Sequence, residues 1–217
     1  MVNFFIISNP KSARYNDIKD KNDVFNGLWF DDDLSQYYKD YNIPYNIKEH
    51  RKNCHIALSQ NHISLLNKIV NDDLYDNVIL EDDAIFDKNE IIEFISKCKD
   101  LLPNSILYLG GMFWGRLVKE KKVVIKDEDK SAGIHIVKDY FRILGTQGYY
   151  IKNSYVAQKI LDNMKNNNNK YYSHTIDNCF VNMKIDKYYI QPRLVKHNRK
   201  YKSIIGNDMN CNNSQEL

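Results

Sequence analysis

The sequence predicts an α/β protein whose central, mostly parallel sheet is flanked by helices. Short apolar segments of strand length alternate with longer segments of helical periodicity along the chain. No internal repeat and no linker rich in Gly, Ser or Pro divides the 217 residues. We therefore expect one domain over residues 1–217, with a polar, frayed tail from about residue 206 to residue 217.

The predicted strands are short apolar runs bounded by turn residues. Asn9–Pro10 ends the first strand and Pro192 ends the last, because proline cannot donate to a strand ladder. Gly110–Gly111 ends a third strand, because glycine readily adopts turn conformations. The predicted strands are Val2–Ser8, Val78–Leu80, Ser105–Leu109, Val123–Ile125, Gly133–Val137, Thr146–Ile151 and Lys187–Gln191.

The predicted helices show apolar residues at helical spacing. In the clearest one, Leu58, His62, Leu65, Leu66 and Ile69 fall on one stripe. Asn153 or Ser154 is the expected N-cap of another, and Pro103 marks the end of a third. The predicted helices are Cys54–Val70, Lys88–Leu102, Ser154–Met164 and Thr175–Met183.

Net charge and the absence of targeting signals limit the function classes. The net charge of +3 is too small to indicate a general nucleic-acid surface, although it allows a local basic pocket for an anionic ligand. The apolar start of the chain is too short for a signal peptide, and no segment is long enough to span a bilayer. We therefore expect a cytoplasmic protein without a transmembrane segment.

Three adjacent acids, Glu81–Asp83, directly follow the buried strand Val78–Leu80. If strand alternation continues, Glu81 and Asp83 point to one side and Asp82 to the other. Ligands of α/β sheets bind at the carboxyl ends of strands, and converging carboxylates suit a hard divalent cation such as Mn²⁺ or Mg²⁺. The alternative is a solvated turn. The immediate return to apolar residues, Ala84–Phe86, favours the wall of a cleft.

A second acidic run, Asp31–Asp33, has a different interpretation. It follows Trp29–Phe30 and leads into the helix-like segment "LSQYYKDY". Asp33 therefore reads as the N-cap of a helix rather than as a ligand-binding carboxylate.

An ordered set of motifs resembles glycosyltransferase family 25, which includes bacterial lipooligosaccharide and collagen galactosyltransferases. The core motif is "CHIALSQNHISLLNKIVNDDLYDNVILEDDAIF". It is followed by "YLGG" at Tyr108–Gly111, by "GTQGYYIKNSYVAQKIL" at Gly145–Leu161, and by "IQPRLV" at Ile190–Val195. The resemblance implies the nucleotide-diphospho-sugar transferase fold known as GT-A, with a divalent metal at Glu81–Asp83.

The resemblance also suggests roles for further residues. Arg14 stands where the family often has an arginine pair, and we assign it, together with Asp82, to binding of the donor nucleotide. Gly110 and Gly111 either form a simple turn or let the backbone approach the sugar. His62 is either a satisfied core histidine or a residue that orients the metal site.

Two late residues complete the predicted site. His197 follows the last strand and is either a third metal ligand beside Glu81 and Asp83 or an exposed histidine. Asp177 stands where the family has a late aspartate. It is either the base that deprotonates the acceptor or an acid that merely favours the first turn of a helix.

We therefore expect a metal-dependent glycosyltransferase that moves a hexose from a nucleotide sugar, UDP-galactose or UDP-glucose, to a hydroxyl group. The acceptor is a glycan, a lipid-linked oligosaccharide or a protein, and the resemblance implies inversion at the anomeric carbon. Clustered acids also occur in metal-dependent nucleases and nucleotidyltransferases. A non-catalytic module that binds nucleotide sugars is the third alternative.

Overall fold

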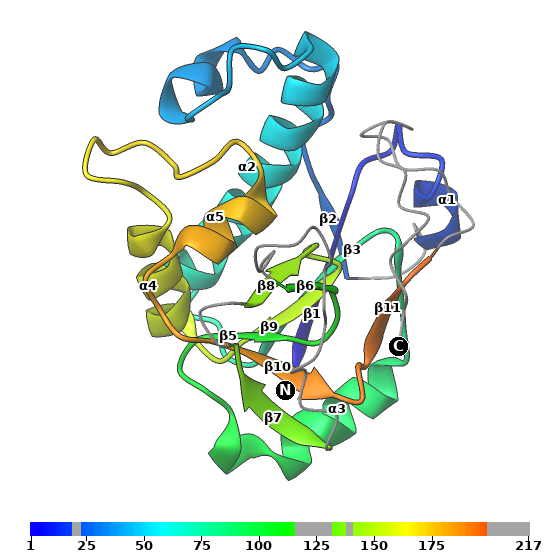
Figure 1. The fold of residues 1–217 in the computed structure, drawn as a ribbon. Coiled ribbons are helices and arrows are strands. Elements are labelled where there is room, and N and C mark those ends of the chain that lie inside the picture. Colours follow the sequence, from blue (N-terminus) through cyan, green and yellow to red (C-terminus); the bar gives the residue numbers. More distant parts are fainter. Residues whose placement is uncertain (19–22, 116–131, 138–140, 199–217) are drawn as a thin grey trace.

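The computed structural model describes residues 1–18, 23–115, 132–137 and 141–198 (Figure 1). The predicted strand Val123–Ile125 and the predicted tail 206–217 lie outside these ranges.

A main sheet crosses the molecule. Its described strands follow the order β2 (Val24–Asn26), β1 (Asn3–Ser8), β3 (Asn77–Glu81), β9 (Gly148–Ile151), β5 (Ile106–Tyr108), β10 (Lys187–Gln191) and β7 (Gly133–Ile136). β1 pairs in parallel with both β2 and β3, and β5 with β10, whereas β9 and β7 are antiparallel to their neighbours. The predicted mostly parallel sheet is confirmed. The two reversed strands were not predicted, because an apolar run carries no information about direction.

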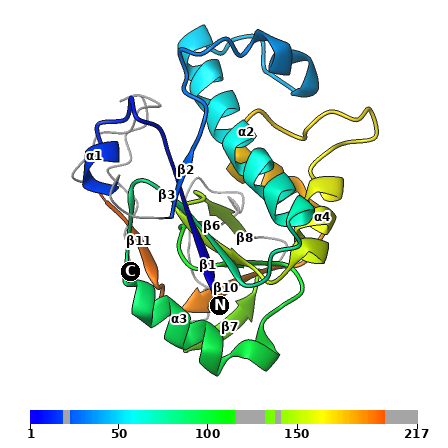
Figure 2. The same cartoon turned by 180° about the vertical axis from the view of Figure 1, so that it is seen from behind.

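Helices cover both faces of this sheet (Figures 1 and 2). The helices α2 (Glu49–Asn71), α4 (Ser154–Asn163) and α5 (Ile176–Asn182) lie on one side, and α3 (Lys88–Lys97) lies on the other. The short helices are α1 (Tyr15–Ile18), η1 (Ser35–Asp40) and η2 (Lys99–Leu101). No helix within the described ranges combines the length and the apolar character needed to cross a bilayer.

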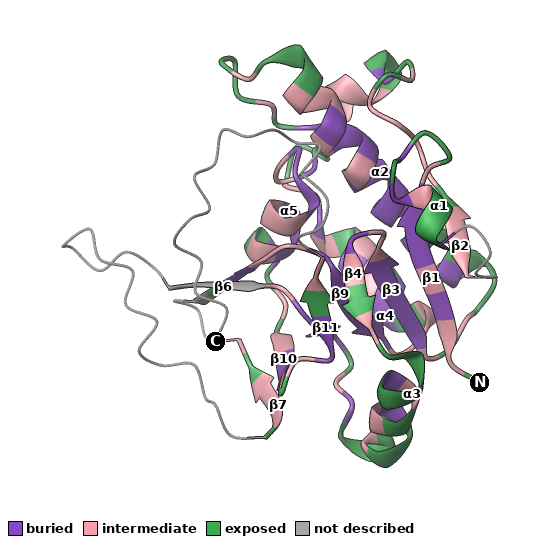
Figure 3. Cartoon of the chain, turned by 90° about the vertical axis from the view of Figure 1, so that its right-hand side faces the viewer, coloured by how far each residue is buried: buried purple, intermediate pink, exposed green. Residues whose placement is uncertain are grey.

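Alternating side chains of the strands feed two separate cores. Ile79 and Tyr149 pack with the helices on one face, whereas Val78 and Leu80 pack with Ile91 of α3 on the other. All five side chains are fully buried, and the sheet forms the buried centre in Figure 3. Burying one large aliphatic side chain contributes about 1.5–3 kcal/mol, so these two cores dominate the stability of the sheet.

The helix ends differ from the prediction in places. The side chain of Asn153 accepts from the backbone N–H of Val156 at 3.0 Å, which confirms the predicted cap of α4. The predicted helix Lys88–Leu102 is divided into α3 and η2. Asp33 accepts from the backbone N–H of Ser35 at 3.0 Å, but the segment forms a 3₁₀-helix with Leu34 at its N-cap. The predicted cap is therefore wrong by one residue: Asp33 is a turn-forming acid that directly precedes the N-cap Leu34.

Two small antiparallel pairs lie outside the main sheet. β4 (Ala84–Phe86) pairs with β11 (Val195–His197), and β6 (Met112–Gly115) pairs with β8 (Phe141–Leu144). Neither pair was predicted from the sequence. The β4–β11 pair brings the end of the described chain beside the acidic triplet.

Candidate functional site

The acidic triplet lies at the carboxyl edge of the main sheet. β3 ends at Glu81, and Ile7, next to the end of β1 at Ser8, is aligned with it. Because β9 runs in the opposite direction, Thr146, which precedes it, lies at the same edge. Three distant chain segments therefore meet where α/β sheets bind their ligands.

Strand geometry stops at Glu81, so the predicted alternation through Asp83 is wrong. Asp82 and Asp83 form a turn, because the chain leaves the main sheet here and β4 pairs with β11 instead. Arg14 contacts both carboxylates. Its Nη1 lies 2.9 Å from Asp82 Oδ1 and 3.3 Å from Asp83 Oδ2.

Asp82 ties the loop after β1 to the triplet. Its Oδ2 accepts from the hydroxyls of Ser8 and Ser12, each at 2.9 Å, while its Oδ1 accepts from Arg14. The side chains of Arg14 and Asp82 are only 9% and 12% exposed. A buried ion pair of this kind is strongly destabilised when one partner is removed. The two residues predicted to bind the donor are thus brought together.

One carboxylate oxygen of Asp83 makes no hydrogen bond in the described structure. Its Oδ2 lies 3.1 Å from Nε2 of His197, and its backbone carbonyl accepts from the N–H of Asn198 at 2.6 Å. Its Oδ1 is buried and has no hydrogen-bond partner among the described residues. The hydrogen bond to Asp83 raises the pKa of His197, although burial opposes this. Two of the three predicted metal ligands, Asp83 and His197, are therefore adjacent.

Glu81 contacts Thr146 and a buried histidine, His62. Thr146 Oγ1 donates to Glu81 Oε1, and Nε2 of His62 lies 3.4 Å from the same oxygen. His62 is 0% exposed, and its Nδ1 lies 2.8 Å from the hydroxyl of Tyr149. Nε2 of His62 has no hydrogen-bond partner among the described residues, so it approaches Glu81 closely without a hydrogen bond. His62 is thus a core histidine that also contacts the triplet.

The three predicted metal ligands do not form one cluster. Within the ranges that the structure describes, no three His, Cys, Asp or Glu side chains are grouped as a metal site. Glu81 faces Thr146 and His62, whereas Asp83 and His197 face each other.

A cavity of about 130 Å³ opens beside the acids. The triplet and Arg14 form one wall, and Trp29, Phe30 and Leu58 contribute the other. The rings of Trp29 and Phe30 lie 4.9 Å apart. Asn61 supports this second wall, since its amide accepts from Leu28 N–H at 2.7 Å and donates to Leu28 O at 3.1 Å. The cavity therefore combines a charged side with an aromatic side.

Close packing explains the two predicted sugar-binding glycines without a ligand. A Cβ on Gly110 would lie 2.4 Å from the carbonyl oxygen of Val195 in β11. Gly111 has φ of +127°, and a Cβ there would lie 2.8 Å from Ile143. Both glycines are thus required for the turn and for the approach of β11, whatever they contribute to binding.

Asp177 lies in the first turn of α5, apart from the triplet. It is half-buried, and its charge raises the pKa of Tyr108, although burial of that phenol is the larger cause. The charge of Asp177 also acts on His174, whose pKa burial lowers. Asp177 is not among the described residues that line the cavity.

Several side chains at the site were not predicted from the sequence. Ser8, Ser12 and Thr146 bind the acids, and Trp29 and Phe30 form the aromatic wall. The position of Ser8 at the end of a predicted strand, level with the acids, is the one local signal that could have indicated its role.

The family comparison agrees with this geometry. The family model of glycosyltransferase family 25 (LPS biosynthesis protein) matches residues 18–180, which include α2, the acidic triplet, β9 and Asp177. No curated protein matches the sequence. The family match favours a glycosyltransferase over the nuclease and nucleotidyltransferase considered above. The chain belongs to glycosyltransferase family 25 and is a glycosyltransferase.

Proposed function

We propose that this enzyme uses a GT-A fold to transfer a hexose from UDP-galactose or UDP-glucose to a hydroxyl group of a glycan, a lipid-linked oligosaccharide or a protein. The reaction is inverting and uses Mn²⁺ or Mg²⁺. The observation that carries the proposal is the environment of Asp83. Its buried Oδ1 has no hydrogen-bond partner among the described residues, and its Oδ2 contacts both Arg14 and His197.

The donor set at Asp83 fits a divalent cation. A carboxylate with an open oxygen and an adjacent imidazole supply two ligands of the kinds that Mn²⁺ accepts. Glu81 would join them only if it left Thr146. When bound, the cation would stabilise the negative charge of the departing nucleotide.

The charged and aromatic walls of the cavity suit a nucleotide. Arg14 is paired with Asp82 and Asp83, so a diphosphate at this edge would need the bound cation to offset the three carboxylates. Trp29 and Phe30 offer ring faces against which a nucleobase can stack. The choice of uracil rests on the family resemblance.

Inversion requires a base on the face of the sugar opposite the nucleotide. Asp177 is the proposed base. Its carboxylate takes the proton of the acceptor hydroxyl, while the hydroxyl oxygen forms a bond to the anomeric carbon. The bond from that carbon to the diphosphate oxygen breaks, and the nucleotide leaves with the electron pair. Asp177 is half-buried in the first turn of α5 and is not among the described residues that line the cavity, so this role rests on the family resemblance.

The direct test is to incubate the enzyme with a panel of nucleotide sugars, with and without Mn²⁺, and to measure the free nucleotide released. We expect UDP release that requires the cation. UDP with Mn²⁺ should also raise the melting temperature more than GDP, ADP or CMP does. A larger shift with GDP would overturn the assignment of the donor.

Substituting Asp177 tests the base separately. Asp177→Asn should lower kcat sharply and leave the affinity for the donor nearly unchanged, because the base acts on the acceptor. If Asp177 only favours the helix, the variant keeps its kcat and loses about 0.3–1 kcal/mol of stability.

A further inference from the structure

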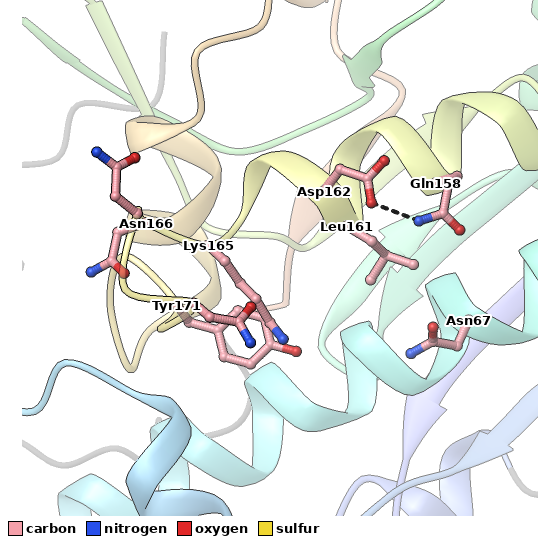
Figure 4. Close-up of a pocket in the computed structure, with 9 residues that line it drawn as sticks. Asn67, Gln158, Leu161, Asp162, Lys165, Asn166 and Tyr171 are labelled. Atoms are coloured by element: carbon pink, nitrogen blue, oxygen red, sulfur yellow. Dashed lines mark hydrogen bonds between the residues drawn. The ribbon is translucent and has the colours of Figure 1, made fainter.

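A second, larger hollow lies between α2, α4 and the loop that follows α4 (Figure 4). Its volume is about 610 Å³, and its walls include Asn67 of α2, Gln158 of α4 and Asn167 of the loop. We call it the amide groove. Asn67 is nine residues beyond Leu58, which lines the cavity beside the acids, so at 1.5 Å per residue the two positions are roughly 13 Å apart along the helix axis. The groove therefore lies farther along α2 than that cavity.

The asparagine-rich loop is held in one conformation. The side chain of Asn166 accepts from the backbone N–H groups of Asn168 and Lys170, at 3.0 and 3.1 Å. The backbone N–H of Asn166 also donates to the carbonyl of Lys170 at 2.7 Å. Tyr171 anchors the end of the loop, since it is buried and its N–H donates to the carbonyl of Asp40 at 2.9 Å. Asn166, Asn167 and Asn169 of this loop line the groove.

The lining of the groove is rich in amides and balanced in charge. Its charged side chains are Asp162 and Lys165, one of each sign. Gln158 Nε2 donates to Asp162 Oδ1 at 2.7 Å, and among the described residues the other oxygen of each side chain has no hydrogen-bond partner. Asn67 Nδ2 donates to the carbonyl of Ile63 at 2.9 Å, so its amide oxygen can still accept a hydrogen bond. Donors and acceptors therefore alternate around the groove.

We propose that the amide groove binds a neutral saccharide. Each sugar hydroxyl donates and accepts at once, and so do side-chain amides, so a ring of hydroxyls pairs with this lining. A nucleotide diphosphate would need an excess of positive charge, which Lys165 opposite Asp162 does not supply. An apolar ligand would need an apolar wall, whereas most of the lining is polar. The volume lies within the roughly 300–1,000 Å³ of small-molecule sites. Because its lining shares no residue with the cavity beside the acids, the groove would hold a part of a glycan that does not react.

The test is binding to an array of neutral oligosaccharides that end in galactose, glucose or N-acetylglucosamine, with their sialylated counterparts beside them. Neither nucleotide nor metal is added, so failure here does not bear on the proposed donor chemistry. We expect neutral glycans to bind. The double variant Gln158→Ala, Asn167→Ala should bind at least about tenfold more weakly with an unchanged melting temperature, because two hydrogen-bonding amides are lost.

The matched control is Asn163→Ala, which removes an amide of α4 that bonds to Lys159 O and does not line the groove. It should bind glycans as the parent does, and so should Asp83→Asn. The proposal is overturned if no neutral glycan on the array binds, or if the double variant binds as well as the parent. Loss of binding in Asp83→Asn would likewise overturn it, because that result assigns the glycan to the catalytic cavity.

Discussion

The two acidic triplets, Asp31–Asp33 and Glu81–Asp83, are similar in composition and opposite in environment. In the first, Lys11 contacts Asp31 at 2.6 Å with both side chains more than half exposed. In the second, Arg14 contacts Asp82 and Asp83 with all three side chains 12% exposed or less. Charge is thus neutralised by a solvated lysine in one case and by a buried arginine in the other.

The partners of the two triplets also differ in sequence distance. Asp32 and Asp33 accept from backbone N–H groups within three residues, those of Trp29 and Ser35, so they shape a turn. Glu81 and Asp83 instead contact side chains far along the chain, those of Thr146 and His197. Long-range partners at a sheet edge, rather than the acids themselves, distinguish a candidate site from a turn.

The largest expected difference is in activity. Asp83→Asn keeps the shape of the side chain but removes the charge, so donor turnover should fall by about 10²–10³-fold, equivalent to a few kcal/mol of transition-state stabilisation. Asp31→Asn, in the exposed triplet, should leave turnover unchanged. The measurement is release of nucleotide by both variants. Equal losses in the two variants, or full activity of Asp83→Asn in EDTA, would contradict the assignment.

The next difference is in stability. Asp82→Ala removes one of the carboxylates that contact the buried Arg14, so the free energy of unfolding should fall by about 2–4 kcal/mol. Asp31→Ala breaks a solvated pair and should cost less than about 1 kcal/mol. Urea denaturation of both variants measures the two values. A small effect at Asp82 would mean that Arg14 is adequately solvated in the native state.

A smaller effect is expected behind Glu81. His62→Gln keeps a hydrogen-bonding group but no longer places it in the same position between α2 and Glu81. We therefore expect kcat to fall by about 10–100-fold while the variant remains folded. Donor affinity and kcat should be measured together with the melting temperature. A variant that unfolds at much lower temperature but retains kcat would show that His62 acts only in the core.

The smallest effect concerns acid titration of the first triplet. The backbone N–H of Trp29 lowers the pKa of Asp32, and Lys11 adds to this. A lowered folded pKa gives stability that is present above the unfolded value and is lost as the pH falls through the folded value. Asp32→Asn should therefore reduce the loss of stability below about pH 4, by less than about 1 kcal/mol. Denaturation midpoints at pH 5 and pH 3 measure this difference. An unchanged pH profile would contradict the role of Asp32.

The layered fold was predictable because its cores follow local patterns. Val78 and Leu80 face one core and Ile79 the other, and an uninterrupted apolar run of this kind indicates a strand buried on both faces. The amphipathic stripe of α2 was equally visible. The direction of β9 was not, since the same residues satisfy either pairing direction. The antiparallel direction of β9 places Thr146 next to Glu81.

The candidate site was predictable only at its centre. The position of Glu81–Asp83 after a buried strand indicated the sheet edge, but the partners of these acids depend on tertiary contacts. Strand alternation failed at Asp83 because β4 pairs with a strand 109 or more residues later rather than extending β3. The contacts of His62 with Glu81 and of His197 with Asp83 were each expected only as one of two alternatives, because no local pattern fixes them.

The pairing of β11 with β4 has a consequence for biosynthesis. Val195 packs against Gly110 and Gly148, and His197 contacts Asp83, so residues 195–197 complete both the packing and the donor set of the site. On a ribosome, the acidic triplet is synthesised more than a hundred residues before these partners. The nascent chain can form β1 and β3 early, but the contacts of the acidic triplet are completed only after His197 has left the exit tunnel.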